Sequence, residues 1–184
     1  ALPRVAAIGE CMARRSEAGG GLLGRKFGGD TLNTAVYLAR LGVAVDYFTA
    51  LGDDPWSEEM LAAWRAEGVG TDRVVRVPGR LPGLHMISTD ADGQRHFWYW
   101  RDSSPARQLF ELPQTPEIAA AIMDYDLIYI SGDTLSPFGD AGRPRSLAMP
   151  DLARAARRAR AIAPNLPTPR WPHATRDQTP LPPT

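Results

Sequence analysis

Apolar and polar positions in the first third of the chain follow two alternating patterns. Short apolar runs at residues 5–8 and 43–50 are typical of buried strands, since they are too short for helices. Residues 30–41 place their apolar side chains on one face at helical spacing, and a second such segment begins at Asp54. The order strand, helix, strand, helix predicts an α/β fold with a mostly parallel sheet.

Helix boundary signals accompany both helical segments. Gly42 follows the first segment at the place where a C-terminal glycine cap belongs. Asp54 can cap the second helix, and Pro55 suits its first position because proline has no backbone N–H to satisfy. Asp30 is placed to cap the first helix in the same way. We therefore expect the two helices to begin and end near these residues.

The pattern changes in residues 73–101, where short strand-like segments alternate with turns. Asp92 and Gly93 separate two such segments, at 84–89 and 95–100, and this dipeptide is a strong β-hairpin signal. The hairpin is therefore predicted to be an insertion in a chain that is otherwise α/β.

The last third of the chain returns to the earlier pattern and then loses it. Residues 127–130 are typical of a buried strand, and 149–161 place alanine and leucine opposite arginine at helical spacing. Residues 162–184 are predicted to be an irregular tail, because proline is excluded from helix and sheet interiors. The prolines of this tail are Pro164, Pro167, Pro169, Pro172, Pro180, Pro182 and Pro183.

Composition narrows the classes of function. The formal net charge of zero favours neither nucleic acid nor an anionic membrane as a partner. No apolar run approaches the roughly 20 residues of a spanning helix, and no signal peptide is recognised. Cys11 is the only cysteine, so we expect a cytoplasmic protein in which Cys11 is a small buried apolar residue. The three histidines have no metal-ligand spacing, and no metal site is expected from them.

Gly28 and Gly29 precede Asp30 and Asn33 at the start of the first predicted helix. Glycine lets a ligand approach the main chain, while a carboxylate and a carboxamide together offer the acceptors and donors that sugar hydroxyls need. A structural interpretation competes with this one, because Asp30 is a good N-cap and a glycine pair can be a tight turn. On spacing alone the structural interpretation is favoured.

Five separated motifs occur in order along the chain: Gly9-Glu10-Cys11-Met12, Phe27-Gly28-Gly29-Asp30-Thr31-Leu32-Asn33-Thr34-Ala35, Leu51-Gly52-Asp53-Asp54, Arg80-Leu81-Pro82-Gly83-Leu84 and Phe97-Trp98-Tyr99-Trp100-Arg101. From about residue 5 to about residue 131 the chain resembles the 2-keto-3-deoxygluconate kinases, a group within the ribokinase-like (PfkB) carbohydrate kinases. The resemblance implies a three-layer α/β fold with a small β lid over the substrate.

The resemblance also implies a domain organisation and partners. Residues 1–161 would be the N-terminal part of a ribokinase-like kinase domain, with lid strands within about 73–101. The family transfers the γ-phosphate of ATP, with Mg²⁺, to the terminal hydroxyl of a sugar acid, and it forms homodimers through the lid. By resemblance, Gly28, Gly29, Asp30 and Asn33 contact the hydroxyls of that acid.

Tyr99 and Arg101 alternate with tryptophans and so share one face if the segment is a strand. Alone, the segment is typical of an ordinary aromatic strand; the resemblance implies that both residues contact substrate. His85 stands where many members carry tyrosine, and a substrate contact and a lid residue without a ligand are both open. Arg14 and Arg15 also depart from the family, and either they alter the sugar pocket or they face solvent.

The late Gly-Ala-Gly-Asp motif that carries the family's catalytic base does not occur in the sequence, and neither does a P-loop. The nearest string, at residues 131–134, is predicted to be a strand-end turn. We therefore expect a C-terminally truncated kinase that lacks the nucleotide half and any catalytic residue. The alternatives are a catalytically incompetent fragment that binds a sugar acid, and another ribokinase-like kinase such as a fructokinase.

Overall fold

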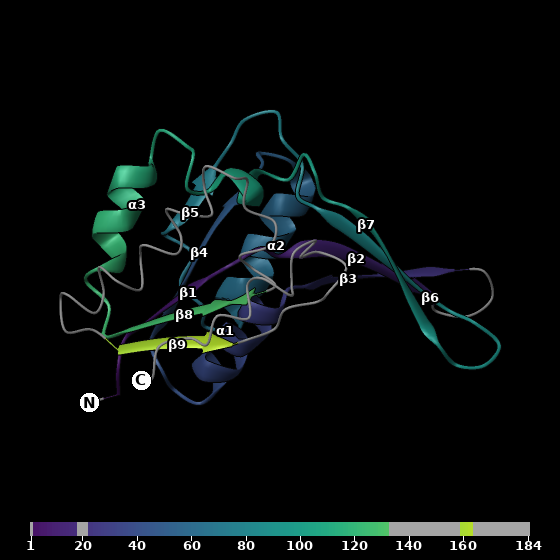
Figure 1. Cartoon of the computed structure of the whole chain (residues 1–184), viewed down its shortest axis with the longest axis horizontal. Coiled ribbons are helices and arrows are strands. Elements are labelled where there is room, and N and C mark those ends of the chain that lie inside the picture. The colour runs from purple at the N-terminus through teal and green to yellow at the C-terminus, as the bar shows by residue number, and fades with distance from the viewer. Residues whose placement is uncertain (1, 18–21, 133–158, 164–184) are drawn as a thin grey trace, which may run out of the picture.

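The computed structural model describes residues 2–17, 22–132 and 159–163, and within them nine strands form two sheets (Figure 1). The main sheet has five strands in the order β5-β4-β1-β8-β9, and every neighbouring pair is parallel. These strands are β1 Val5–Ile8, β4 Val45–Leu51, β5 Val74–Arg76, β8 Leu127–Ser131 and β9 Ala159–Ala163. The predicted parallel α/β sheet is confirmed.

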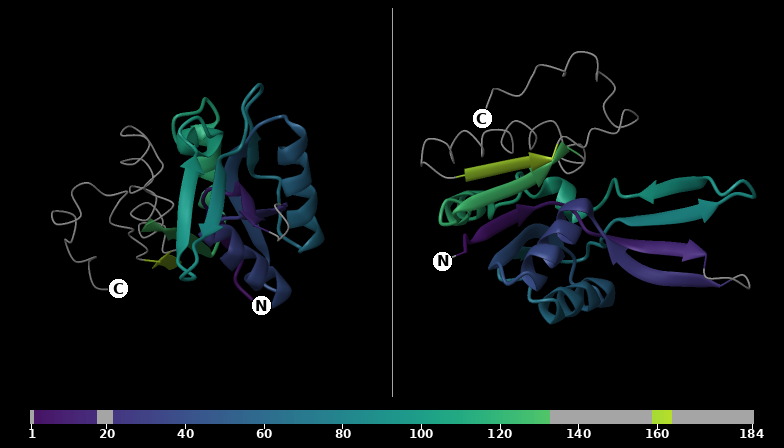
Figure 2. Two further views of the ribbon diagram at one scale, coloured as in Figure 1. Left: turned by 90° about the vertical axis from the view of Figure 1, so that its right-hand side faces the viewer. Right: turned by 90° about the horizontal axis from the view of Figure 1, so that it is seen from below.

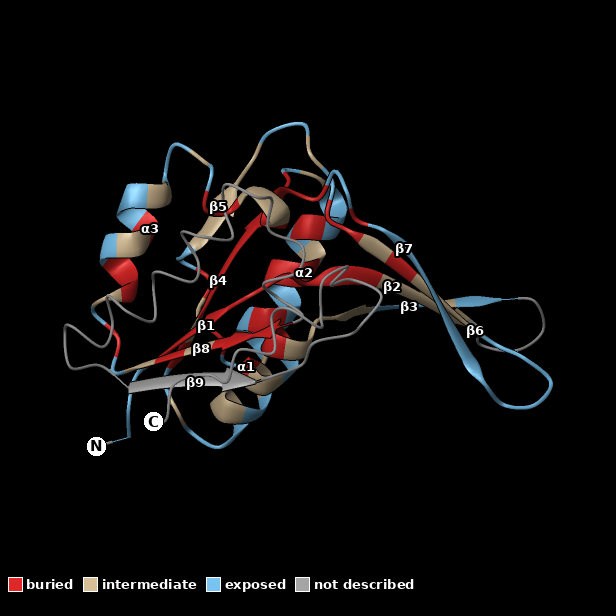
Figure 3. Ribbon diagram, viewed as in Figure 1, coloured by how far each residue is buried: buried red, intermediate tan, exposed pale blue. Residues whose placement is uncertain are grey.

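Helices cover both faces of the main sheet. Helices α1 (Asp30–Arg40) and α2 (Pro55–Ala66) pack on one face, where Val5 and Ala7 of β1 point. The short 3₁₀ helix η1 (Pro105–Gln108) and α3 (Thr115–Ile122) belong to the other face, where the alternate β1 residues point. The central strands are consequently buried on both sides (Figure 3). The expected three layers are present.

A second sheet of four strands, which we call the lid sheet, extends away from the main sheet (Figures 1 and 2). Its order is β3-β2-β6-β7, from β2 Met12–Glu17, β3 Leu23–Gly28, β6 Leu84–Thr89 and β7 Arg95–Trp100. The two hairpins β2–β3 and β6–β7 are each antiparallel, and they are joined by parallel pairing of β2 with β6.

The predicted hairpin is confirmed, with Gly93 in the left-handed region at φ 80°. The other hairpin, β2–β3, has no counterpart among the predicted elements. Strand β5 lies within 73–101 but pairs with β4, so it belongs to the main sheet and not to the lid sheet.

The end of α1 has the predicted glycine cap. Gly42 has φ 81°, its N–H donates to the carbonyl of Ala39 at 2.9 Å, and the N–H of Val43 donates to that of Leu38 at 3.0 Å. These two bonds form a Schellman motif, which satisfies carbonyls that the helix leaves open. In the described part of the chain no helix has the length and apolar character needed to cross a bilayer.

The predicted helix at 149–161 is wrong where the structure tests it. Residues 159–163 form β9, which pairs in parallel with β8 and places Ile162 beside Ile130. Helical spacing of alanine and arginine carries no information about a strand partner 32 positions earlier, so tertiary pairing overrides it. Residues 149–158 and the predicted irregular tail from 164 lie outside the described residues.

The N-terminal cap of α2 should be replaceable by asparagine but not by alanine. The Asp54 carboxylate accepts from the N–H groups of Trp56 at 3.0 Å and Ser57 at 3.2 Å. We expect Asp54→Ala to lower the free energy of unfolding by about 1 kcal/mol, because two helix N–H groups lose their acceptor. Asp54→Asn keeps an acceptor and is the matched control. Urea titrations of both variants measure this, and equal losses would contradict it.

Candidate functional site

The chain passes between the main sheet and the lid sheet close to Glu10. Glu10 follows β1, and its backbone carbonyl lies against Gly29, where the chain leaves the lid sheet for α1. Its side chain lies against Gly83, just before β6, and bonds Arg101, just after β7. Glu10 therefore contacts the other three points at which the chain enters or leaves the lid sheet.

Glu10 and Arg101 form a buried ion pair. The Arg101 Nη2 donates to Glu10 Oε2, and the side chains are 8% and 2% exposed. The remaining carboxylate oxygen, Glu10 Oε1, and Arg101 Nε have no hydrogen-bond partner among the described residues. Sequence reasoning singled out Arg101 and missed Glu10, because one acidic residue after a strand has no spacing pattern that reveals a partner 91 positions later.

The two predicted glycines have different structural roles. A Cβ on Gly29 would lie 2.2 Å from the carbonyl oxygen of Glu10, so Gly29 is required for close packing of two backbone segments. A Cβ on Gly28 would meet nothing within 4 Å. Only Gly28 therefore borders open space into which a ligand could come close to the main chain.

Asp30 does not cap α1, which corrects that interpretation of it. The N-cap is Gly29, and Asp30 is the first helical residue. Its carboxylate accepts from the Thr31 N–H at 2.7 Å and from the hydroxyl of Ser131 at the end of β8. Asp30 is thereby held at the carboxyl end of the main sheet, the edge where parallel α/β sheets bind ligands. Asn33, one turn further along, has an exposed side chain.

The structure brings together the three predicted residues of the lid sheet. His85 and Tyr99 are directly opposite on β6 and β7, with ring centroids 5.9 Å apart. The Arg101 guanidinium lies 5.9 Å from the Tyr99 ring centroid, on the predicted shared face. His85 is buried, whereas Tyr99 is 39% exposed. Through Arg101, this group is joined to Glu10, and through Glu10 to Gly29.

Cys11 is buried, as predicted. Burial raises the pKa of its thiol far above the ordinary range, and the negative charge of Glu10 raises it further. Because the thiolate is the reactive form, Cys11 is an inert apolar residue and not a nucleophile.

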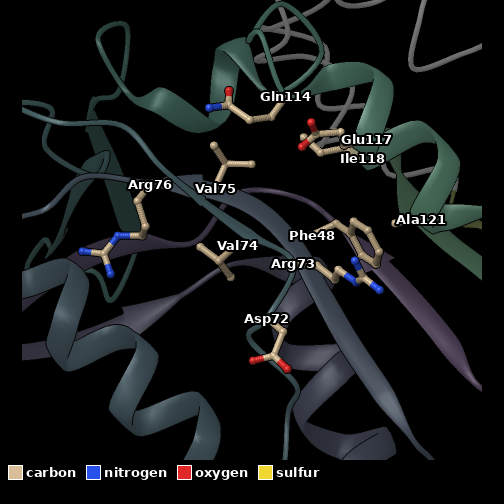
Figure 4. Close-up of a pocket in the computed structure, with 10 residues that line it drawn as sticks. All are labelled: Phe48, Asp72, Arg73, Val74, Val75, Arg76, Gln114, Glu117, Ile118 and Ala121. Carbon is tan, nitrogen blue, oxygen red and sulfur yellow. The ribbon is translucent and has the colours of Figure 1, made fainter.

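No group of three or more His, Cys, Asp or Glu residues that could hold a metal ion occurs among the described residues. A cavity of about 260 Å³ opens between β5 and α3, lined by residues such as Phe48, Arg73 and Glu117 (Figure 4). None of the predicted site residues lines this cavity.

Comparison with known proteins gives a consistent result. The model of the pfkB family carbohydrate kinases matches residues 3–182. The 2-dehydro-3-deoxygluconokinase of Dickeya dadantii is 46% identical over 155 residues, which are 82% of this chain and 50% of that protein. That of Escherichia coli K12 is 42% identical over 150 residues, covering 79% and 48%. Fructokinase-1 of rice is 29% identical over 147 residues, covering 79% and 43%.

Solved structures have the same fold. A PfkB protein from Polaromonas sp. JS666 superposes with a TM-score of 0.81 at 25% identity, covering 92% of this chain and 58% of that one. The 2-dehydro-3-deoxygluconokinase of Thermotoga maritima gives 0.79 at 20% identity, covering 92% and 53%. A fructokinase with bound ATP from Xylella fastidiosa gives 0.75 at 22%, covering 94% and 55%. The chain thus spans about half the length of these relatives.

Alanine at the two glycines should separate structure from ligand access. We expect Gly29→Ala to lower the free energy of unfolding by about 2 kcal/mol or more, because its Cβ would overlap a backbone oxygen. Gly28→Ala has room for its methyl group and should change stability by less than about 0.5 kcal/mol. Chemical denaturation of both variants measures the difference, and a stable Gly29→Ala protein would contradict the packing described.

Proposed function

Because this chain belongs to the pfkB family of carbohydrate kinases, we propose that it is the substrate-binding part of a 2-keto-3-deoxygluconate (2-dehydro-3-deoxygluconate) kinase. The main support for this proposal is sequence identity. The chain is 46% and 42% identical to two 2-dehydro-3-deoxygluconokinases, but only 29% identical to a fructokinase. The reaction transfers the γ-phosphate of ATP to the terminal hydroxyl of the sugar acid.

The corner at the start of α1 binds the hydroxyls of the acid in this proposal. Gly28 borders open space in which the ligand would lie, and the close contact of Gly29 with Glu10 fixes the path of the chain there. Asp30, held by Ser131, accepts hydrogen bonds, and the Asn33 carboxamide both accepts and donates them. A corner of this kind fits a polyhydroxylated ligand because it offers donors and acceptors beside exposed main chain.

The lid sheet supplies the second wall of the proposed pocket. Tyr99 and Arg101 bind oxygens of the substrate, and His85 beside Tyr99 joins them. Each charge-assisted hydrogen bond from Arg101 would contribute roughly 1.5–3 kcal/mol to binding. Closing the lid sheet over the sugar would exclude water, which strengthens electrostatic interactions in the site.

ATP and Mg²⁺ are the cofactors of the proposed reaction, in which ATP supplies the phosphoryl group and Mg²⁺ shields the phosphates. A fructokinase of the same fold has been solved with bound ATP, which supports ATP as the donor. The described residues contain no metal-ligand cluster, so none of them is proposed to hold the metal. The cytoplasm, where ATP and free cysteine coexist, is the proposed location.

The substrate is testable with a coupled spectrophotometric kinase assay across sugars, on the protein that carries this sequence. We expect 2-keto-3-deoxygluconate to be phosphorylated with a kcat/KM at least about tenfold above that of fructose, because Arg101 and Tyr99 offer donors that suit an acid. Preference for a neutral hexose would overturn the proposal. In a second experiment, the same assay is carried out on the 184-residue polypeptide alone. Turnover by it would reject the alternative that it binds the acid without catalysis.

We also propose a homodimer formed through the lid sheet. Trp98 and Trp100 of strand β7 lie on the face opposite Tyr99, and each is 57% exposed. Contiguous apolar surface of this kind commonly marks a protein interface. The lid sheet of a second copy has the same surface and is the proposed partner.

Sedimentation equilibrium should give the mass of a dimer at micromolar concentration. Trp98→Glu should shift the protein to a monomer, because a charge would be desolvated in the interface. Tyr37→Glu, at a 65% exposed position on α1, is the control and should leave the dimer intact. A monomeric mass for the unaltered protein would count against the dimer.

A further inference from the structure

Two side-chain hydrogen bonds join the first turn of α1 to the end of β8. The Ser131 hydroxyl donates to the Asp30 carboxylate, and the hydroxyl of Thr34 bonds that of Tyr129 at 3.2 Å. Positions 129 and 131 point to the same side of the strand, and positions 30 and 34 lie on one face of the helix. The two bonds therefore connect one face of β8 with one face of α1.

The geometry of the two elements allows both bonds to form together. Four residues of an α-helix rise about 6 Å, and two residues of a strand rise about 6.6 Å. Asp30 bonds the later of the two strand residues and Thr34 the earlier one, so α1 runs antiparallel to β8. Because the two rises are nearly equal, neither element has to bend.

The Ser131 hydroxyl determines how the Asp30 carboxylate is oriented. The last torsion of an aspartate side chain is broad, so its rotamer alone does not fix the plane of the carboxylate. Two donors fix this plane, because the Thr31 N–H binds one oxygen and the Ser131 hydroxyl binds the other. A carboxylate has about four acceptor sites, and these two donors do not exhaust them. Asp30 is thus held in one orientation in which it can accept further hydrogen bonds.

Ser131 lies behind Asp30 and is closed to solvent. Its exposed fraction is 0%, whereas Asp30 is half-buried. Thr34 supports the same arrangement from the helix side, because its hydroxyl also lies 3.3 Å from the backbone carbonyl oxygen of Asp30. Any effect of Ser131 on a ligand at the start of α1 must therefore pass through the Asp30 side chain.

We propose that Ser131 is a positioning residue of the sugar site, which orients the Asp30 carboxylate for the hydroxyls of the sugar acid. The inference rests on the proposed function and adds to it a residue that does not touch the substrate. Without the Ser131 hydroxyl, the carboxylate would sample several orientations. Binding would then include the free-energy cost of ordering it, so orientation in advance strengthens the interaction with substrate.

The start of α2 provides a matched control. The Ser57 hydroxyl donates to the Asp54 carboxylate at 2.5 Å, and Ser57 is likewise 0% exposed. Ser57→Ala and Ser131→Ala each remove one buried hydroxyl that donates to an aspartate at the beginning of a helix. Asp54 is not part of the proposed pocket, so only Ser131→Ala should affect the substrate.

The test is the coupled kinase assay with 2-keto-3-deoxygluconate, on the protein that carries this sequence. Ser131→Ala should lower kcat/KM about three- to tenfold, whereas Ser57→Ala should change it by less than about twofold. Ser131→Thr keeps the hydroxyl and should also stay within about twofold. Thermal unfolding shows whether each variant is folded. If Ser131→Ala is not, Ser131→Cys replaces it and should lower kcat/KM, because a thiol is a weak donor.

A double-mutant cycle with Asp30 separates positioning from a purely structural role. Asp30→Ala alone should lower kcat/KM at least about tenfold, since it removes a charged acceptor. Adding Ser131→Ala should then lower kcat/KM by less than about a further twofold, because the partner of the hydroxyl is already gone. The ratio kcat/KM is measurable below saturation, so weakly binding variants remain within reach of the assay.

Several results would overturn the role of Ser131 and leave the proposed function standing. One is an equal loss from Ser131→Ala with and without Asp30, which would indicate a general disturbance of β8. The others are full activity of Ser131→Ala and an equal loss in Ser57→Ala. Failure of the unaltered protein to phosphorylate the acid would instead contradict the proposed function itself.

Discussion

The buried ion pair between Glu10 and Arg101 fixes how the two sheets of this protein are joined. Each residue belongs to a different point of passage between the sheets, and the glycines at the other two points are packed against Glu10. Removing one partner of such a pair typically costs about 3–5 kcal/mol, because the other charge stays buried without compensation. The pair therefore constrains the lid sheet, the start of α1 and the chain before β6 together.

This constraint changes how the site must be interpreted. From sequence alone, Arg101 is expected to be an unpaired cation that can bind the carboxylate of a ligand. In the structure its charge is neutralised by Glu10, which lies at the junction of the two sheets. The Arg101 side chain therefore helps to fix the geometry of this junction and also lies beside Tyr99 on the lid sheet.

Strands β1, β4 and β8, helices α1 and α2 and the hairpin β6–β7 were predictable because their signals are local, whereas β9 overlaps a segment that was predicted to be helical. Asp54-Pro55, Gly42 and the turn at Asp92-Gly93 each determine backbone geometry within a few residues. The hairpin β2–β3 was not predictable, since its charge-rich strands lack an apolar alternation. The role of Glu10 could not be predicted for a related reason, because its ion-pair partner is 91 positions away in the sequence. The glycine pair was correctly predicted to precede α1, but only the packing in the structure shows that Gly29 is in close contact with Glu10 and Gly28 is not.

The parallel pairing of β2 with β6 also has a consequence for how the protein folds. Each hairpin of the lid sheet is local and can close early, on the microsecond scale typical of hairpins. Their junction is different, because its strands are far apart in sequence and loop closure must precede any gain from pairing. The lid sheet is thus expected to become one sheet late. We expect β2 to pair with β6 only after β1 has paired with β4, because that pairing brings the bases of both hairpins to the same edge of the main sheet.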